Sequence, residues 1–138
     1  MIKLTERFDQ YAYSVAVKPS EHLLDVGFEE GQWVAPGANG YDFPTAGAKA
    51  FMLISSKRTG RDQFSGKASA PDTSAPAQVY VGSFALATDQ FDTNETYAAG
   101  DALYVKADGK LTNNGSGVVV AYATGIVQGN KFLPIVSA

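Results

Sequence analysis

The sequence predicts an all-β protein: a compact sandwich or partly closed barrel of short antiparallel strands with long irregular loops and little or no helix. Valine, tyrosine and phenylalanine supply much of the apolar bulk, with seven Tyr and eight Phe in 138 residues, and such residues favour strands. Several segments alternate apolar and polar residues with a period of two. No window keeps the apolar spacing and caps of a helix. One domain over residues 1–138 is the simplest organisation for this length.

Four short segments in the first half of the chain have the pattern of strands. Residues 11–19 (YAYSVAVKP) alternate, and the strand is expected to end near Pro19 because proline cannot donate to a ladder. Residues 22–28 (HLLDVGF) alternate Leu, Val and Phe with Asp and Gly, which predicts a second strand. Residues 32–37 (QWVAPG) and 49–56 (KAFMLISS) predict two more, and a Pro-Gly turn ends the first of these.

The longest strand candidate is residues 78–88 (QVYVGSFALAT). Both of its faces are apolar, which predicts a strand at the centre of a sandwich or barrel. Gly82 lies inside it and predicts a bulge or a bend. The connection that follows, residues 89–101, has room for a single helical turn.

Two hairpins are predicted in the last third of the chain, which brings the expected total to nine or ten short strands. The first reverses at Asp108-Gly109 between the strands 101–105 and 110–112. A type I′ turn is expected there, because Asp-Gly suits the positive φ that this turn needs at both central residues. The second hairpin joins residues 117–127 to the C-terminal KFLPIVSA and reverses at Gly129-Asn130.

One spacing occurs twice in the sequence. In both places an aromatic residue is followed by two residues, a glycine and a polar residue, and then by a short strand and a glycine-containing turn. The residues are Phe28, Gly31 and Gln32 in the first place and Tyr97, Gly100 and Asp101 in the second. One interpretation is a duplicated hairpin unit packed face to face, and the other is a chance likeness between two hairpins of a glycine-rich β protein.

Composition narrows the function classes. The chain has no cysteine, which excludes disulfides, thiolate catalysis and Cys-ligated zinc. Its net charge of −3 argues against general nucleic-acid binding. No apolar run approaches the roughly 20 residues needed to cross a bilayer, and the charged start MIKLTERFDQ lacks an apolar signal core. We therefore expect synthesis in a cytoplasm, with neither nucleic acid nor membrane as a partner.

No catalytic or cofactor motif stands out. His22 is the only histidine and no G-x-S-x-G elbow occurs, so a Ser-His-Asp system is not supported. Residues 89–95 (DQFDTNE) gather oxygen ligands but lack the glycine and the terminal glutamate of an EF-hand loop. Turn residues between two strands are the favoured interpretation of this segment. We expect a binding or structural module without a cofactor, and not an enzyme.

Two segments are candidates for irregular arms. Residues 1–10 form a possible N-terminal arm, and residues 57–77 a long flexible loop or arm that mixes Gly, Ser, Pro and charges. The second segment is basic in its first half and carries one aromatic residue, Phe64. It is either a contact surface or a solvated loop without a function.

The stretch TDQFDTNETYAAGDALYVKADGKLTNNGSGVVVAYATGIV resembles the C-terminal part of small all-β head decoration (cement) proteins of tailed bacteriophages. The resemblance covers about the last third of the chain, and its motifs are structural. They are a Tyr-x-x-Gly-Asp-x-Leu strand entry, a Gly-Lys-Leu-Thr hairpin and a closing ATGIV. The residues that carry it are Tyr97, Gly100, Asp101, Leu103, Gly109, Lys110, Leu111, Thr112, Gly125 and Val127.

The resemblance implies a non-enzymatic protein that is made in the host cytoplasm and resides on the capsid surface of the virion. It would bind the major capsid protein on the assembled shell, as a homo-oligomeric dimer or trimer, and stabilise that shell. Arms that order on binding would staple neighbouring subunits. The candidate residues for contact with the capsid or another subunit are Lys57, Arg58, Arg61, Phe64 and Lys67 in the basic loop, and Ile2, Leu4 and Phe8 near the N-terminus.

Two other functions stay open at this point. The first is a phage tail or baseplate component with a carbohydrate-binding β module, in which Trp33, Tyr41 and Tyr11 form an exposed aromatic platform. The second is a small β-barrel enzyme with paired carboxylates, which requires a pocket lined by Asp and Glu side chains.

Overall fold

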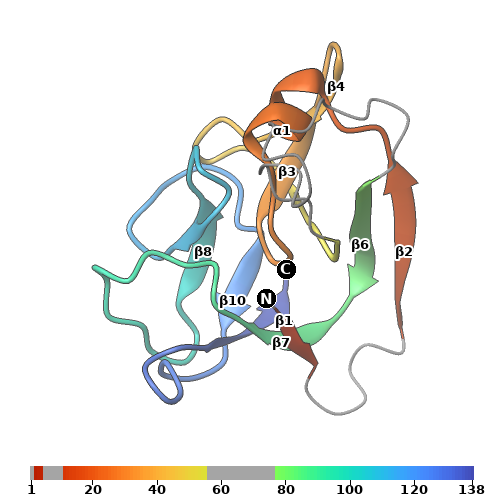
Figure 1. Cartoon of the computed structure of the whole chain (residues 1–138). Helices are drawn as coiled ribbons and strands as arrows, with labels where there is room; N and C mark the ends of the chain where they lie inside the picture. Colours follow the sequence, from red (N-terminus) through yellow and green to blue (C-terminus); the bar gives the residue numbers. More distant parts are fainter. Residues whose placement is uncertain (1, 5–10, 56–76) are drawn as a thin grey trace, which may run out of the picture.

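The computed structural model describes residues 2–4, 11–55 and 77–138, and Figure 1 shows how their elements are arranged. Within these residues the chain forms antiparallel sheets and no closed barrel, so the all-β prediction is confirmed in its sandwich-like form. In the same residues one helix, α1 (Glu21–Val26), accompanies eleven strands. The strands are β1 (Ile2–Leu4), β2 (Tyr11–Val17), β3 (Trp33–Gly37), β4 (Gly40–Asp42), β5 (Phe51–Met52), β6 (Ala77–Ser83), β7 (Ala85–Thr88), β8 (Ala102–Val105), β9 (Leu111–Thr112), β10 (Ala121–Ala123) and β11 (Leu133–Ser137).

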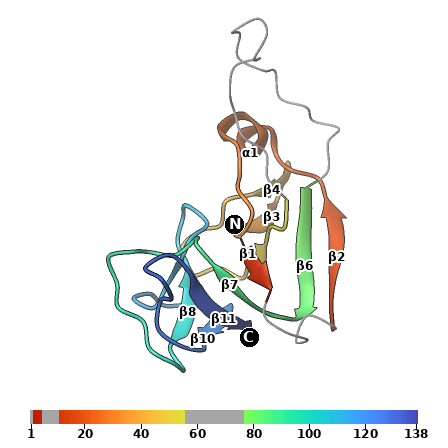
Figure 2. The same cartoon turned by 60° about the horizontal axis from the view of Figure 1, so that its bottom comes forward.

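The strands fall into two groups with the same order. The largest sheet runs β1-β7-β11-β10-β8-β9, and the other strands form the ladders β4-β3-β5 and β2-β6. A bridge between Leu53 and Val79 joins these two ladders in the order β4-β3-β5-β6-β2. This order matches β9-β8-β10-β11-β7 in the large sheet. We call residues 11–55 with 77–83 the first repeat and residues 85–137 the second repeat; Figure 2 shows β2 and β6 of the first on the opposite side of the molecule from β8, β10 and β11 of the second.

The twofold aromatic-x-x-Gly-polar motif builds the same turn in both repeats. The Gln32 N–H donates to the Glu29 carbonyl at 3.1 Å, and the Asp101 N–H donates to the Ala98 carbonyl at 3.2 Å. The side chains of Gln32 and Asp101 accept hydrogen bonds from the N–H groups of Glu29 and Ala98, at 2.7 and 2.9 Å. The intervening glycine has a φ of +98° in the first turn and +92° in the second.

The strand pairs that follow the two turns also match. Trp33 pairs with Met52 between β3 and β5, and Ala102 pairs with Tyr122 between β8 and β10. The entry into each central hairpin is repeated as well, because Ser20 and Asp92 occupy equivalent places. The Ser20 N–H donates to the Tyr41 carbonyl at 2.8 Å, and the Asp92 N–H donates to the Leu111 carbonyl at 2.7 Å. These matching strand pairs and hydrogen bonds favour a duplication over a chance likeness. The duplicated unit is then five strands and not a single hairpin.

The expected strand at residues 22–28 is wrong, because most of this segment is helix α1. The Ser20 Oγ accepts the Leu23 N–H at 3.0 Å and caps the N-terminus, and Gly27 ends the helix with a φ of +83°. Leu23 and Leu24 are buried while the rest of the helix is exposed. A segment of six residues is too short to distinguish the period of a helix from the alternation of a strand, so the sequence pattern predicted the wrong element.

The segments around β5 and β6 are also divided more finely than expected. Of the described residues 49–55, only Phe51–Met52 form a strand, with Leu53 in a single bridge. The segment 78–88 is two strands in different sheets that are separated at Phe84, and Gly82, with a φ of +94°, lies within β6 two residues before this break. Every residue of β7 is buried, as a central strand requires, whereas β6 is exposed at several positions.

The type I′ turn expected at Asp108-Gly109 is wrong, and the turn at Gly129-Asn130 has that conformation instead. Asp108 does not have positive φ; the Gly109 N–H donates to the Lys106 carbonyl at 3.0 Å and Gly109 alone has positive φ, +80°. This is a three-residue loop with a G1 bulge, not a type I′ turn. Gly129 and Asn130 have φ of +60° and +56°, as both central residues of a type I′ turn require.

Two apolar clusters hold the strands together, and β3 and β5 contribute to both. Val34 belongs to a cluster that the first repeat makes alone, and Phe51 packs against that cluster. Trp33 and Met52 belong to the larger cluster, which is otherwise built mostly by the second repeat. Because neighbouring side chains of a strand point to opposite faces, β3 and β5 lie between the two clusters and join them.

Candidate functional site

A pocket of about 170 Å³ lies at the junction of the repeats. The first repeat lines it with Trp33, residues 49–51 and the end of β6, and the second repeat lines it with residues 118–120 and the last two residues of the chain. The ring centroids of Tyr80 and Phe84 are 5.4 Å apart, and those of Trp33 and Phe84 are 6.5 Å apart. A cavity of about 150 Å³ can hold a benzene ring, so this pocket can accept one aromatic or branched aliphatic side chain.

Trp33 lines the pocket, but its side chain is otherwise buried. It is 3% exposed, and in the described structure its buried Nε1 has no hydrogen-bond partner. An unsatisfied buried donor costs about 1–3 kcal/mol. The expectation that Trp33 is an exposed platform residue for a sugar is wrong, since Trp33 is buried and Tyr41 is half-buried.

Three of the five exposed large apolar side chains among the described residues lie in the segment 117–127. Val118, Tyr122 and Ile126 are 46%, 41% and 70% exposed. The sequence of this Gly- and Val-rich segment gives no indication of which members face solvent. Val118 also lines the pocket and gives it an exposed apolar rim.

A second, polar hollow lies where α1 meets the β3–β4 hairpin, and it contains the only histidine. The His22 Nδ1 is 3.0 Å from Asp42 Oδ1, and this ion pair ties α1 to β4. The hydrogen bond to Asp42 raises the pKa of His22 above its ordinary value. Burial by itself raises the pKa of Asp42, but the hydrogen bonds from His22 and from the Phe43 N–H outweigh burial, and the pKa is lowered. The buried Ser20 hydroxyl hydrogen-bonds to Asp42, not to His22, so the group lacks an activated nucleophile.

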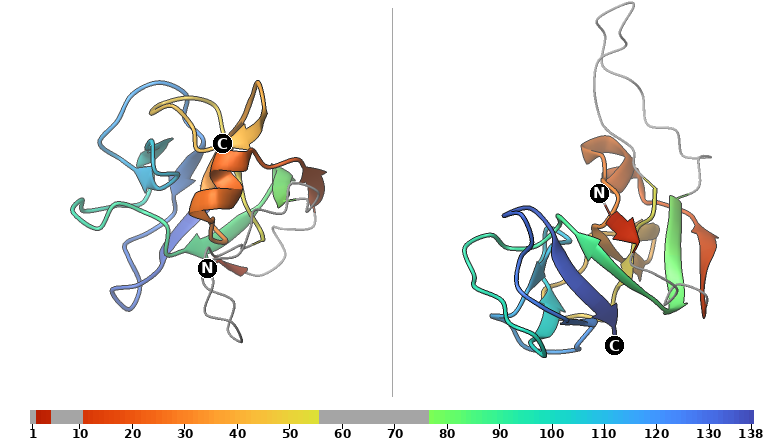
Figure 3. Two further views of the ribbon diagram at one scale, coloured as in Figure 1. Left: turned by 45° about the horizontal axis from the view of Figure 1, so that its top comes forward. Right: turned by 90° about the horizontal axis from the view of Figure 1, so that it is seen from below.

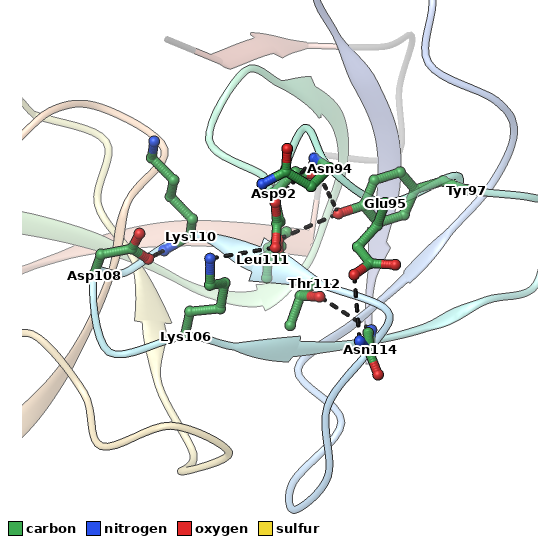
Figure 4. Close-up of polar contacts among 10 residues, drawn as sticks. All are labelled: Asp92, Asn94, Glu95, Tyr97, Lys106, Asp108, Lys110, Leu111, Thr112 and Asn114. Carbon is green, nitrogen blue, oxygen red and sulfur yellow. Dashed lines mark hydrogen bonds and ion pairs between the residues drawn. The ribbon is translucent and has the colours of Figure 1, made fainter.

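The acidic segment 89–95 is held as a capped turn, as Figure 4 shows. Asp92 accepts the Asn94 N–H at 3.0 Å and pairs with the Lys106 ammonium at 3.3 Å. The Asn94 N–H and Lys106 lower the pKa of Asp92. The Tyr97 hydroxyl donates to the Asp92 carbonyl at 2.7 Å, and burial raises the pKa of Tyr97 to about 12. This network fixes the connection between β7 and β8 onto the β8–β9 hairpin, which agrees with the turn interpretation.

In the part of the chain that the structure describes, no three His, Asp or Glu side chains gather closely enough to hold a metal ion. No helix among the described residues has the length and apolar character needed to cross a membrane.

Most of the predicted contact residues lie outside the described residues: Lys57, Arg58, Arg61, Phe64, Lys67 and Phe8. Ile2 and Leu4 lie in β1, which pairs with β7. Ile2 is half-buried, packs against the larger cluster and donates its N–H to Glu30 at 2.7 Å. Of the long loop expected at residues 57–77, only Ala77 is described, as the first residue of β6. The contact role of these residues stays a prediction.

Comparison of the chain with models of known protein families, with curated proteins and with solved structures found no match.

Proposed function

We propose that this protein is a viral structural protein that binds the outer surface of an assembled phage capsid and stabilises it. The observation that carries the proposal is the apolar pocket between the repeats, with the exposed Val118 at its rim. This arrangement suits protein docking, in which an apolar side chain of the major capsid protein enters the pocket.

The sequence resemblance to capsid decoration proteins supports the choice of partner. The residues that carry it build the turn at Tyr97, the β8–β9 hairpin and β10, and the exposed apolar stretch 117–127 belongs to the same segment. Many copies on a symmetric shell add weak contacts into a strong assembly, because each bound copy holds its neighbours in place. A modest pocket is therefore sufficient for the role.

The test mixes the purified protein with undecorated capsids and measures co-sedimentation and the temperature at which the capsids open. We expect binding and a higher opening temperature. No binding and no gain in heat resistance would overturn the proposed function.

A matched pair of variants tests the pocket separately. Val118→Arg places a charged side chain at the pocket rim, whereas Val26→Arg places it on α1 at a residue with the same 46% exposure. We expect Val118→Arg to weaken capsid binding at least about ten-fold, or about 1.4 kcal/mol, and Val26→Arg to leave it unchanged. Equal binding by both variants and the wild type would remove the pocket from the docking surface while leaving capsid binding intact.

A further inference from the structure

Strand β2 is the longest strand edge left open in the described structure. The six-stranded sheet ends at β1 and β9, and the order β4-β3-β5-β6-β2 ends at β4 and β2; of these, β1, β9 and β4 have only two or three residues each. Strand β2 has seven residues, and within the described part of the chain it pairs with β6 alone. Its sequence YAYSVAV holds no charge, proline or glycine. Charged residues and prolines are among the usual devices by which proteins keep an edge strand from pairing with another chain, and β2 lacks them.

The second repeat shows what covers the equivalent edge. Strand β7 occupies the place of β2, because both lie beside the equivalent strands β11 and β6. The outer edge of β7 is paired antiparallel with β1, which places Ile2 opposite Thr88 and Leu4 opposite Leu86. One molecule therefore contains the same edge in a covered form and in an open form.

Strand β2 also exposes side chains on its two faces. Ser14, Val15 and Ala16 are consecutive exposed residues, and Val15 is 39% exposed. Because neighbouring side chains point to opposite faces, both faces of β2 meet solvent there. In the partner strand β6, Gln78, which pairs with Ala16, is exposed, and so are Gly82 and Ser83 at the other end of the ribbon. Figure 3 shows β2 and β6 at the outside of the molecule in both views. A two-stranded ribbon is marginally stable by itself.

We propose that the β2 edges of two copies of this chain pair antiparallel across a twofold axis and form a dimer with a continuous sheet. The antiparallel direction is the one that β1 takes on β7. An edge can pair with itself in this direction, because a twofold axis makes the contact isologous. The absence of charge in β2 means that two copies do not repel each other. A register centred on Ser14 overlaps all seven residues of both strands. The proposal does not depend on the capsid role.

Single-cysteine variants test the pairing directly, because the wild-type chain has no cysteine. Facing residues of antiparallel strands have Cα atoms about 4.5–5.5 Å apart, a distance that suits a disulfide. We expect Ser14→Cys to give a disulfide-linked dimer on mild oxidation. The control is Gln78→Cys, an exposed residue on β6 that lies opposite Ala16 and away from the axis, and it is expected to stay monomeric in SDS gels. Failure of Ser14→Cys and of the neighbouring Tyr13→Cys and Val15→Cys to cross-link would overturn the proposal.

Sedimentation velocity over about a hundred-fold range of concentration measures the dimer without cross-linking. Val15→Lys adds a charge to the exposed edge, and Gln78→Lys adds one on the adjacent strand. We expect Val15→Lys to weaken dimerisation at least ten-fold and Gln78→Lys to change it little, with circular dichroism checking that both variants are folded. A wild type that is monomeric throughout, or an oligomer that Val15→Lys leaves intact, would show that two copies do not meet at this edge.

Discussion

The equivalent glycines Gly31 and Gly100 form a natural matched pair for testing the contact between the repeats. They occupy the same turn position with φ of +98° and +92°, so an alanine meets the same backbone strain at both. Their surroundings differ. A Cβ atom at Gly31 would lie 2.9 Å from Thr88 Oγ1 and 3.1 Å from Gln90 Cγ, whereas a Cβ atom at Gly100 would have nothing within 4 Å.

The losses of unfolding free energy caused by Gly31→Ala and Gly100→Ala should therefore differ only by the steric clash of the new Cβ atom at Gly31. The positive φ costs an alanine about 1–2 kcal/mol at either site. At Gly31 the neighbours cannot move easily, because Thr88 is fully buried and its Oγ1 accepts the Gln90 N–H at 3.0 Å. Overpacking of this kind adds about 1–3 kcal/mol. We expect Gly100→Ala to lower the free energy of unfolding by about 1–2 kcal/mol and Gly31→Ala by about 2–5 kcal/mol.

Urea unfolding followed by circular dichroism measures both values, and an unchanged slope against denaturant would show that the change lies in stability. Thermal unfolding gives a second estimate, at about 3 °C for each kcal/mol in a chain of this size. Equal losses for the two variants would refute the close contact between Gly31 and the second repeat. A Gly100→Ala variant as stable as the wild type would refute the shared turn geometry.

Three further predictions concern the polar contacts. Ser20→Ala removes the α1 cap and should cost about 1 kcal/mol of unfolding free energy, while Ser20→Thr should restore most of it; equal stability of all three proteins would contradict the cap. The Asp42 pair raises the pKa of His22, so its stabilising effect is complete below the ordinary histidine pKa and is lost as pH rises through the raised value; an NMR titration of His22 should show a lower pKa in Asp42→Asn, and an unchanged pKa would refute the pairing. Tyr97→Phe removes the hydrogen bond to the Asp92 carbonyl and should lower the free energy of unfolding by about 1 kcal/mol. An ultraviolet titration of this variant should lack the tyrosine that ionises near pH 12. If that ionisation persists, Tyr97 is not the group responsible.

Local sequence signals predicted the features that depend on a few adjacent residues. Gly129-Asn130 tolerates positive φ at two successive positions and forms the expected turn. The strand β2 ends shortly before Pro19, and Gly82 has the positive φ that a glycine allows. In each case the residue type itself restricts the backbone, so the outcome depends little on the rest of the molecule.

The errors occurred where the wider structure chose between local alternatives. The alternation in residues 22–28 suits a strand as well as a helix, and the cap from Ser20 together with burial of Leu23 and Leu24 selects the helix. Asp108-Gly109 forms a bulged loop, and its glycine carbonyl accepts the Trp33 N–H at 2.8 Å from the first repeat. No short window contains that partner. The orphaned Trp33 donor and the pocket likewise depend on residues that are far apart in the sequence.

The all-β class, the main turns and the recurrence of the aromatic-x-x-Gly-polar motif can be predicted from the residue pattern, because backbone restrictions and side-chain alternation act over a few residues. The pattern does not reveal that this recurrence belongs to two five-strand repeats with matching registers, since strand pairing depends on contacts between distant segments. The same long-range contacts make the two repeats end differently. The edge of β7 is covered by the N-terminal strand β1, while in the described chain the equivalent edge of β2 has no further strand paired to it.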